Sequence, residues 1–414
     1  MNTMSYDVLV IGGGASGMMA AGRAAERGLR VLLLEKNAKL GEKLSITGGG
    51  RCNITNAEDD TRRFLAKYGT ADKFLHTTFS QFGVRDTFSF FESRGLPLMV
   101  EAQQRVFPVS ERAPDVVAVL TRYLTEGAVD VRTNVTVKNI VATRGRIERV
   151  ETDAGDFSAQ TYILATGGMS HPETGSTGDG FAWLAKLGHT IATPTPTLVP
   201  LQVQEAWVTA LAGVSLSSVR ISFYVDTQKK FTRTGQLLFT HFGISGPTIL
   251  NSAGKVHSLL PEGTVTAYLD LFPGIDAGTL DTRIVEFFAQ HKNKVFKNVL
   301  KDIVPPGMAS TLIALLPNAE PETPVHSVTK ETRKNLVALV KRLPLTITGL
   351  MGFDRAVVAD GGLPLTEIDP RTMRSTRYEN LMVTGDLLHI LRPSGGYSLQ
   401  LCWTTGFVAG THAS

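Results

Sequence analysis

The sequence predicts an α/β fold in which buried parallel strands alternate with helices. The first observation is the short apolar run Val8–Ile11, which leads at once into Gly12–Gly17, a match to G-x-G-x-x-G. The second is an Ala- and Met-rich helical stretch, followed by the apolar run Arg30–Leu34 and by Glu35. Strand, glycine turn, helix and strand in this order are typical of a Rossmann-type unit.

The glycines and the acid predict a dinucleotide site. Gly12 makes the tight turn, Gly14 lets backbone approach a pyrophosphate, and Gly17 lets the helix pack closely on the strand. The helix start at Ala15–Ser16 offers N–H groups and a partial positive charge to the phosphates. Glu35 is placed to accept hydrogen bonds from ribose hydroxyls, which favours FAD or NAD over NADP.

The composition predicts two or three domains with a substantial core. The chain has 414 residues, and 43% of them are hydrophobic against 19% charged, so disorder is not expected. The formal charge is +4, but no long basic run occurs. We therefore expect a small-molecule substrate and no nucleic-acid partner.

Two cysteines, Cys52 and Cys402, are too few for a disulfide framework or a cysteine-rich zinc site. We expect a cytoplasmic protein without a bound metal. Met1–Tyr6 has no basic region, and no run of about 18 apolar residues occurs. These features predict neither a signal peptide nor a membrane span.

The stretch Lys36–Asn56 predicts a ligand-binding loop. Three consecutive glycines, Gly48–Gly50, are flanked by Ser, Thr, Arg and Asn, which make a poor core. Glycine permits close backbone approach, and Arg51 can pair with a phosphate or a flat ring. A flexible surface loop is the alternative.

Helices and strands alternate through the rest of the first domain. Phenylalanines mostly three and four residues apart predict helices over Asp59–Gly95, with this aromatic stripe in the core. Tyr162–Ala165 predicts a buried strand that ends at Thr166–Gly168, where open α/β sheets place ligands. A helix follows Gly175–Gly180, and we expect Asp179 to cap it.

The pattern changes after a proline-rich stretch at 194–200. Val219–Val225 and Val265–Leu271 alternate apolar and polar residues, which predicts antiparallel strands. The pattern over Asp281–Leu343 predicts helices. His241 is a candidate for catalysis, and a hydrogen-bonded, partly buried structural role fits it equally well.

The C-terminal part repeats the first motif. Leu381–Thr384 predicts a last buried strand, which is closed by Gly385–Asp386. Pro393–Tyr397 then opens an apolar helix from Ser398 to Ala409. This second strand–glycine–helix junction predicts that the cofactor is held from both ends of the chain.

These motifs resemble the HI0933-like flavoprotein family, which includes aminoacetone oxidase-like enzymes and a flavin reductase of bile-acid intermediates. The resemblance covers essentially the whole chain, and it implies FAD rather than NAD. Its most specific segments are Ile46–Asn56, Ala165–Gly168 with Gly175–Gly180, Phe239–Pro247 and Gly395–Tyr397.

The resemblance implies a particular domain organisation. Residues 1–192 and 353–414 would form a Rossmann-type FAD-binding domain. An antiparallel β-barrel domain, 193–272 with 345–352, and a helical domain, 273–344, would be inserted into it.

The resemblance also implies the parts of FAD that individual residues contact. Arg51, Cys52 and Asn53 would lie along the ribityl and flavin portion, and Asp386 would meet the ribitol or the pyrophosphate. N–H groups of Gly396 and Tyr397 would face the flavin pyrimidine. Such donors stabilise negative charge on the reduced ring. The predicted cofactor-binding residues are Gly12, Gly14, Ala15, Ser16, Gly17, Glu35, Lys36, Lys43, Gly49, Gly50, Arg51, Cys52, Asn53, Val135, Thr166, Gly167, Gly168, Asp179, Gly385, Asp386, Gly395, Gly396, Tyr397 and Ser398.

The chain departs from the family pattern near its C-terminus. Asp386 stands where family members more often have Glu, and Leu388–Arg392 replaces an acidic, glycine-containing turn. His389 or Arg392 would suit an anionic substrate, which places the family's amine or steroid substrates in doubt. Drift in a solvent-facing turn is the alternative.

We expect a cytoplasmic FAD-dependent oxidoreductase that transfers hydride between flavin N5 and a small or medium organic substrate. Reduction of an activated C=C bond with NADH or NADPH as donor is the leading prediction. An amine oxidase that uses O₂, an RNA-binding or RNA-modifying flavoprotein and a non-catalytic flavin sensor are the alternatives. The catalytic candidates for proton transfer are His389, Tyr397 and His241.

Overall fold

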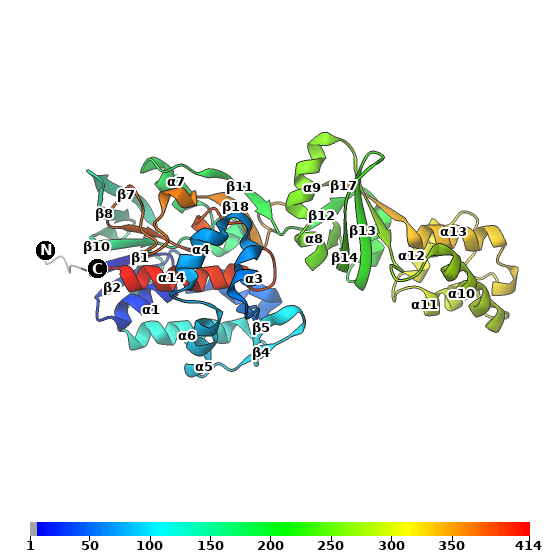
Figure 1. The fold of residues 1–414 in the computed structure, drawn as a ribbon, viewed down its shortest axis with the longest axis horizontal. Helices are drawn as coiled ribbons and strands as arrows, with labels where there is room; N and C mark the ends of the chain where they lie inside the picture. The colour runs from blue at the N-terminus through cyan, green and yellow to red at the C-terminus, as the bar shows by residue number, and fades with distance from the viewer. Residues whose placement is uncertain (1–5) are drawn as a thin grey trace. The chain divides into compact units, whose positions relative to one another are not determined.

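The computed structural model describes residues 6–414. The prediction that the N-terminus lacks a signal peptide concerns Met1–Ser5 in large part, and these lie outside the described residues. Contacts divide the chain into two units, one running to Pro196 and resuming at Ala356, the other spanning Thr197–Arg355 (Figure 1).

The first unit is built on a five-stranded parallel sheet in the order β19-β10-β1-β2-β6. Its central strands are fully buried, with Val8, Leu9 and Val10 at 0% exposure. Strands covered on both faces consist of continuous apolar runs, as these do. The strands are β1 (Tyr6–Ile11), β2 (Val31–Leu34), β6 (Asp130–Arg132), β10 (Ala159–Leu164) and β19 (Leu381–Val383).

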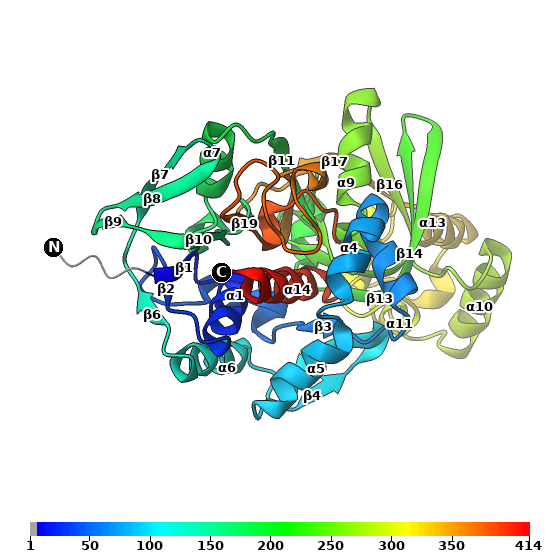
Figure 2. The same cartoon turned by 60° about the vertical axis from the view of Figure 1, so that its left-hand side comes forward.

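Two helices from opposite ends of the chain pack side by side, α1 (Ala15–Glu26) and α14 (Tyr397–His412) (Figures 1 and 2). Glycines on α14 allow this close approach. A Cβ on Gly406 would lie 2.3 Å from the carbonyl oxygen of Ser16, and one on Gly410 would lie 2.4 Å from that of Ala20. The N-terminal and C-terminal segments therefore form one core.

Further helices and small sheets complete the first unit. The short sheets have the orders β3-β5-β4, β7-β8-β9 and β11-β18. The helices are α2 (Glu42–Ser45), α3 (Thr61–Leu65), α4 (Asp72–Phe79), α5 (Val84–Ser93), α6 (Ala113–Glu126) and α7 (Asp179–Lys186). The strands are β3 (Thr55–Asn56), β4 (Leu98–Val100), β5 (Arg105–Pro108), β7 (Val137–Thr143), β8 (Arg146–Thr152), β9 (Gly155–Phe157), β11 (Ala192–Thr197) and β18 (Val358–Gly362).

The second unit contains a closed barrel with the strand order β12-β15-β14-β13-β16-β17. The two alternating segments of the sequence form neighbouring antiparallel strands, β13 and β16, in which Phe223 pairs with Ala267. The strands are β12 (Leu201–Val203), β13 (Ser215–Val225), β14 (Gln228–Thr240), β15 (Gly243–Ser245), β16 (Val265–Asp270) and β17 (Leu343–Leu350). The helices are α8 (Pro247–Leu250), α9 (Ala253–Leu259), α10 (Ala277–Gln290), α11 (Phe296–Ile303), α12 (Ala309–Leu315) and α13 (Lys330–Lys341).

The Rossmann-type, mixed α/β part of the predicted fold class is confirmed by the parallel sheet and its glycine turn. The predicted separation of a β-barrel domain from a helical domain at 273–344 stays a prediction. No helix within residues 6–414 combines the length and apolar character that crossing a bilayer requires.

A buried polar network joins two separate segments of the first unit. His189 Nδ1 lies 2.5 Å from Glu367 Oε2, and His189 Nε2 lies 3.0 Å from Ser375 Oγ. The arrangement has the order of a catalytic triad, but Ser375 Oγ also accepts hydrogen bonds from the backbone N–H groups of Arg377 and Tyr378. Because the serine and histidine are 6% and 5% exposed, we assign the network a structural role.

Glu367 is the charged member of this network. Burial alone would raise its pKa, but hydrogen bonds from His189, Thr190 and Arg377 outweigh that effect and lower the pKa to about 2. Burial also lowers the pKa of His189, against the opposing effect of Glu367. The pair therefore consists of a neutral imidazole and a carboxylate.

We expect Glu367→Gln to lower the free energy of unfolding by about 1–3 kcal/mol at neutral pH, because a charge-assisted hydrogen bond is lost. The pKa of Glu367 is depressed from 4.5 to about 2, so its contribution is complete above pH 4.5 and disappears as the pH falls toward 2. Urea unfolding of both proteins at neutral pH and at acidic pH measures this difference. The exposed Glu148→Gln serves as the control, and a difference that does not depend on pH would contradict the assignment.

Candidate cofactor site

The candidate site lies where the carboxyl ends of four parallel strands meet. β1 leads into Gly12, β2 into Glu35, β10 into Ala165–Gly168, and β19 into Thr384–Asp386. Open α/β sheets bind ligands at this edge, at the topological switch point, where the connections from neighbouring strands run to opposite sides. Here that point is at β1, which pairs with β10 on one side and β2 on the other.

Glycine is needed at the three positions of the G-x-G-x-x-G motif for different structural reasons. Gly12 has a φ of 105°, and a Cβ on Gly17 would lie 1.9 Å from the Gly12 carbonyl oxygen. Both positions therefore require glycine for the fold itself. A Cβ on Gly14 would meet no protein atom within 4 Å, and Gly14 is the N-cap of α1. The space beside Gly14 and the free N–H groups of the first turn can take an anion.

Glu35 is held rigidly at the end of β2. Its carboxylate accepts hydrogen bonds from the backbone N–H of Gly13, at 2.7 Å, and of Asn37, at 2.8 Å. Its own carbonyl accepts from the N–H of Val135 at 3.0 Å, which brings this predicted residue to the same strand end. Each carboxylate oxygen keeps a second lone pair that can accept a ribose hydroxyl.

Asp179 does not cap helix α7, contrary to the sequence prediction. It is the first residue of that helix, whose N-cap is Gly178, and it pairs with Lys36 at 2.7 Å. Burial would raise its pKa, but the hydrogen bonds from Lys36 and Thr177 outweigh burial and lower it. Lys36 Nζ donates hydrogen bonds to Thr177 Oγ1 and to Asp179 Oδ2. The Asp179 carboxylate is therefore engaged by this lysine and not by the N–H groups of the helix.

The glycine-rich loop combines open backbone with unpaired polar atoms. Gly49 and Gly50 have φ values of 69° and 88°, and a Cβ on either would meet no protein atom within 4 Å. Asn53 Oδ1 is buried without a hydrogen-bond partner. Cys52 is fully buried, and burial raises the pKa of its thiol to about 12, so it stays protonated.

Arg51 is engaged by protein groups. Its guanidinium forms ion pairs with Glu101 and Glu111 and lies 4.2 Å above the centre of the Phe107 ring. The sequence shows the arginine but gives no sign that two distant carboxylates neutralise it. A phosphate would have to displace one of these acids to bind here.

A second polar group surrounds Asp386. Lys43 Nζ lies 2.6 Å from Ser170 Oγ and 3.2 Å from Asp386 Oδ2. Arg392 Nη1 lies 3.1 Å from Asp386 Oδ1. Burial would raise the pKa of Asp386, but the charges of Arg392 and Lys43 lower it, so this carboxyl is ionised. Ser170 and the burial of Arg392 were not predicted from the sequence.

Helix α14 begins at the same site. Its N-cap Gly396 has a φ of 99°, and a Cβ there would lie 2.2 Å from the backbone of Thr55. Asn56 Nδ2 donates to the carbonyl of Gly395 at 3.2 Å. Because the first N–H groups of a helix have no partner within it, Tyr397 and Ser398 can donate to a ligand.

The catalytic candidates lie in different environments. His389 is 42% exposed, with Nε2 at 3.6 Å from Asp360 Oδ1. The Tyr397 ring is buried 4.8 Å from the centre of the Phe64 ring, and burial raises its pKa. His241 is exposed and belongs to the second unit.

The residues present fit a bound FAD. Among the described residues, three side-chain oxygens at these strand ends and loops are buried without a hydrogen-bond partner: Asn53 Oδ1, Thr166 Oγ1 and Asp386 Oδ1, of which the last forms an ion pair with Arg392. A ligand rich in hydroxyls and N–H groups would satisfy them. Two glycine-capped helix N-termini, those of α1 and α14, supply donors for phosphates and for a flavin ring.

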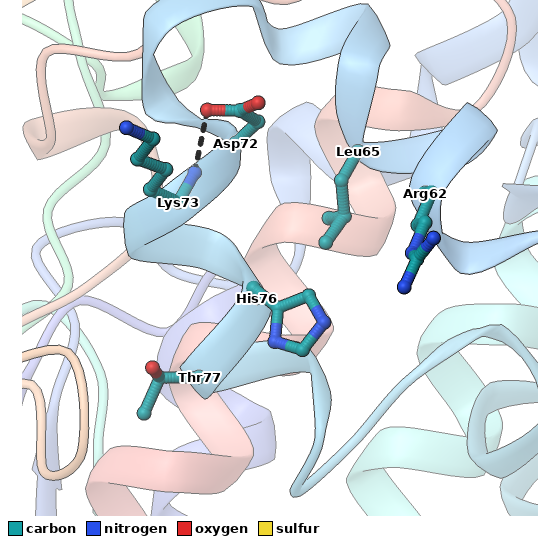
Figure 3. A pocket seen from close by; sticks show the side chains of 6 residues that line it. All are labelled: Arg62, Leu65, Asp72, Lys73, His76 and Thr77. Atoms are coloured by element: carbon teal, nitrogen blue, oxygen red, sulfur yellow. Dashed lines mark hydrogen bonds between the residues drawn. The ribbon is translucent and has the colours of Figure 1, made fainter.

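A separate hollow of about 420 Å³ lies over helices α3 and α4 (Figure 3). It is lined by Leu65, Thr77 and Asp72 together with three basic side chains, Arg62, Lys73 and His76. Asp72 Oδ1 accepts a hydrogen bond from the backbone N–H of Lys73. The hollow therefore carries an excess of positive charge.

Comparison with known proteins decides the family. Residues 6–412 match the HI0933-like protein Rossmann domain. The chain belongs to the HI0933-like family. This HI0933-like protein is 31% identical to the 3-dehydro-bile acid delta(4,6)-reductase of Clostridium scindens over 98% of each chain. It is 25% identical to the ribosomal RNA dihydrouridine synthase of Escherichia coli, over 97% of this chain and 96% of the relative.

Solved structures support the fold of the HI0933-like chain. The 3-ketosteroid-delta4-(5alpha)-dehydrogenase of Rhodococcus jostii aligns with a TM-score of 0.56 and 15% identity, covering 100% of this chain and 98% of that one. An open flavocytochrome c3 fumarate reductase aligns with a TM-score of 0.55 and 16% identity, covering 100% and 78%. With its family membership, the protein is an FAD-dependent oxidoreductase.

A substitution at Gly14 should affect cofactor binding but not folding in this HI0933-like protein. We expect Gly14→Val to raise the dissociation constant for FAD at least about tenfold, because its side chain would fill the space beside the helix N-terminus. The melting temperature of the apoprotein should change little, since no protein atom lies within 4 Å of the added Cβ. Fluorescence titration and circular dichroism measure the two quantities.

Gly17→Val is the matched variant, because its Cβ would collide with the Gly12 carbonyl. It should lower the melting temperature as well as FAD affinity. Equal effects of the two substitutions on apoprotein stability would contradict the assignment of Gly14 to the ligand.

Proposed function

We propose that this protein uses FAD to reduce a carbon–carbon double bond conjugated to a carbonyl group, in a small or medium organic molecule, with NADH or NADPH as donor. The observation that carries the proposal is the whole-length similarity to two kinds of reductase. The delta-4 and delta-6 double bonds of a 3-dehydro bile acid are conjugated to its 3-oxo group, and the double bond that distinguishes uridine from dihydrouridine is likewise conjugated to a carbonyl. The relatives' names therefore share one chemistry.

The two helix N-termini support this proposal. The first turn of α1, beside Gly14, would bind the cofactor diphosphate, and Glu35 would accept the ribose hydroxyls. The N–H groups of Tyr397 and Ser398 would face the flavin pyrimidine and favour negative charge there. When bound, FAD supplies hydride transfer at N5.

Reduction of a conjugated double bond also needs a proton. His389 is the best-placed candidate on the first unit, because it is 42% exposed and Asp360 Oδ1 lies 3.6 Å from its Nε2. The carboxylate can orient the imidazole. Tyr397 is a weaker candidate because its ring packs among Phe64 and Tyr68, and its backbone N–H has the stronger role. His241 remains a candidate from the second unit.

A second candidate function is reduction of uridine in RNA. The observation that favours it is the basic hollow of Arg62, Lys73 and His76, which could contact phosphates of the RNA backbone (Figure 3). Two relatives named ribosomal RNA dihydrouridine synthases match nearly the whole chain, at 26% and 25% identity. This candidate revises the expectation that nucleic acid is no partner.

The reductase proposal predicts a specific anaerobic experiment. NADH or NADPH should bleach the visible flavin absorbance of the holoprotein, and a steroid 4-en-3-one should restore it. An unconjugated alkene should not, because only a conjugated carbonyl stabilises the charge left by hydride addition. His389→Ala should slow reoxidation by about 10²-fold with FAD still bound. Bleaching by an amine, with rapid reoxidation by O₂ alone, would identify the oxidase instead.

The RNA candidate predicts salt-sensitive binding through the basic hollow. Arg62→Ala and Lys73→Ala should each weaken binding of a ribosomal RNA fragment and reduce the slope of log affinity against log salt by about one. Filter binding over a range of salt concentrations measures both effects. Lys186→Ala, an exposed lysine on α7, is the control and should change neither. Equal losses in all three variants would contradict a role of this hollow.

A further inference from the structure

Arg392 is a buried cation with unused hydrogen-bonding capacity. Its side chain is 1% exposed, and its guanidinium has five N–H donors and no acceptor. Only Nη2 has a hydrogen-bond partner, the Ala359 carbonyl oxygen at 2.9 Å. Nε and Nη1 are buried without one, although Nη1 lies 3.1 Å from Asp386 Oδ1. The ion pair is close but not aligned as a hydrogen bond.

The charges around Arg392 do not balance. Within residues 6–414, Asp386 is the single carboxylate in ion-pair contact with Arg392, and it also faces Lys43 at 3.2 Å. Two cations therefore share one anion, and all three side chains are at most 22% exposed. A buried excess charge with unpaired donors is unfavourable unless a bound group compensates it. This balance points to an anionic group bound at the same place.

The position of Arg392 indicates which part of the cofactor supplies that charge. Arg392 precedes the start of α14 by a few residues, and its charge acts on the hydroxyl of Tyr68. That hydroxyl donates to the carbonyl of Tyr397, the first residue of α14, at 2.8 Å. The opposite helix N-terminus, that of α1, already provides donors for the diphosphate. Arg392 thus lies on the side proposed for the flavin ring.

We propose that the positive charge of Arg392 stabilises the negative charge that the flavin ring would carry after two-electron reduction, and so makes bound FAD easier to reduce. When bound, FAD would accept a hydride at N5 from NADH or NADPH, the donor would leave as NAD or NADP in its oxidised form, and the reduced ring would carry one negative charge. Because protein groups cover almost the whole Arg392 side chain, its charge would act on the ring through the intervening side chains and not by direct contact. The inference rests on the proposed FAD site and is independent of the proposed double bond.

The test is a spectroelectrochemical titration of the holoprotein without substrate. Arg392→Met removes the charge and keeps an apolar stem, and Arg392→Lys keeps the charge. We expect Arg392→Met to weaken binding of reduced FAD at least about tenfold relative to oxidised FAD, which lowers the midpoint potential by about 30 mV. Arg392→Lys should retain most of the wild-type value. Asp386→Asn, which removes the counter-charge, should raise the potential.

Binding of ADP separates the flavin ring from the diphosphate. ADP affinity should be the same in wild-type protein and in Arg392→Met, because ADP carries no flavin. A loss of ADP affinity equal to the loss of FAD affinity would assign Arg392 to the diphosphate and overturn the proposal. An unchanged potential in Arg392→Met would overturn it as well. If Arg392→Met fails to fold or to bind FAD, an unchanged or lowered midpoint potential in Asp386→Asn would overturn the proposal instead.

The titration also distinguishes this inference from the proposed reaction. A lowered potential together with no turnover of any conjugated carbonyl would retain the role of Arg392 and reject the substrate class. An unchanged midpoint potential in Arg392→Met, together with normal turnover of a conjugated carbonyl, would retain the substrate class and reject the role of Arg392.

Discussion

The contact between helices α1 and α14 is the constraint on which the cofactor site depends. Gly406 and Gly410 let α14 approach the backbone of α1 at Ser16 and Ala20, where any side chain would collide with a carbonyl oxygen. This contact places the two helix N-termini, and the loops before them, at one edge of the parallel sheet. The positive ends of both helices can therefore act on a single anionic ligand.

The cations of the site differ in whether neighbouring carboxylates neutralise them. Arg51 is neutralised by Glu101 and Glu111, and Lys36 by Asp179. Around Asp386, in contrast, two cations face one carboxylate, and two nitrogens of Arg392 have no hydrogen-bond partner among the described residues. This excess positive charge lies at the carboxyl end of β19, where it can act on an anionic group bound at the strand ends.

Local sequence patterns predicted the first strand–helix–strand unit. They could not predict side-chain contacts between residues that are far apart in the sequence. The β1–α1–β2 unit and Glu35 follow from steric needs that a few consecutive residues express. The partners of Arg51 lie 50 and 60 residues away, and those of His189 lie at 367 and 375. A charged residue in a turn, such as Arg392, is normally exposed, so its burial required the fold to be known.

The order of the chain has a consequence for biosynthesis. The second unit is one continuous segment, Thr197–Arg355, whereas the first unit needs both Tyr6–Pro196 and Ala356–Ser414. On a ribosome, the inserted segment is complete while the sheet still lacks β19 and the helix that pairs with α1. Assembly of the dinucleotide site must therefore wait until β19 and α14 have been synthesised, and a truncation before Leu381 would leave the site without one strand of its sheet and without the helix that packs on α1.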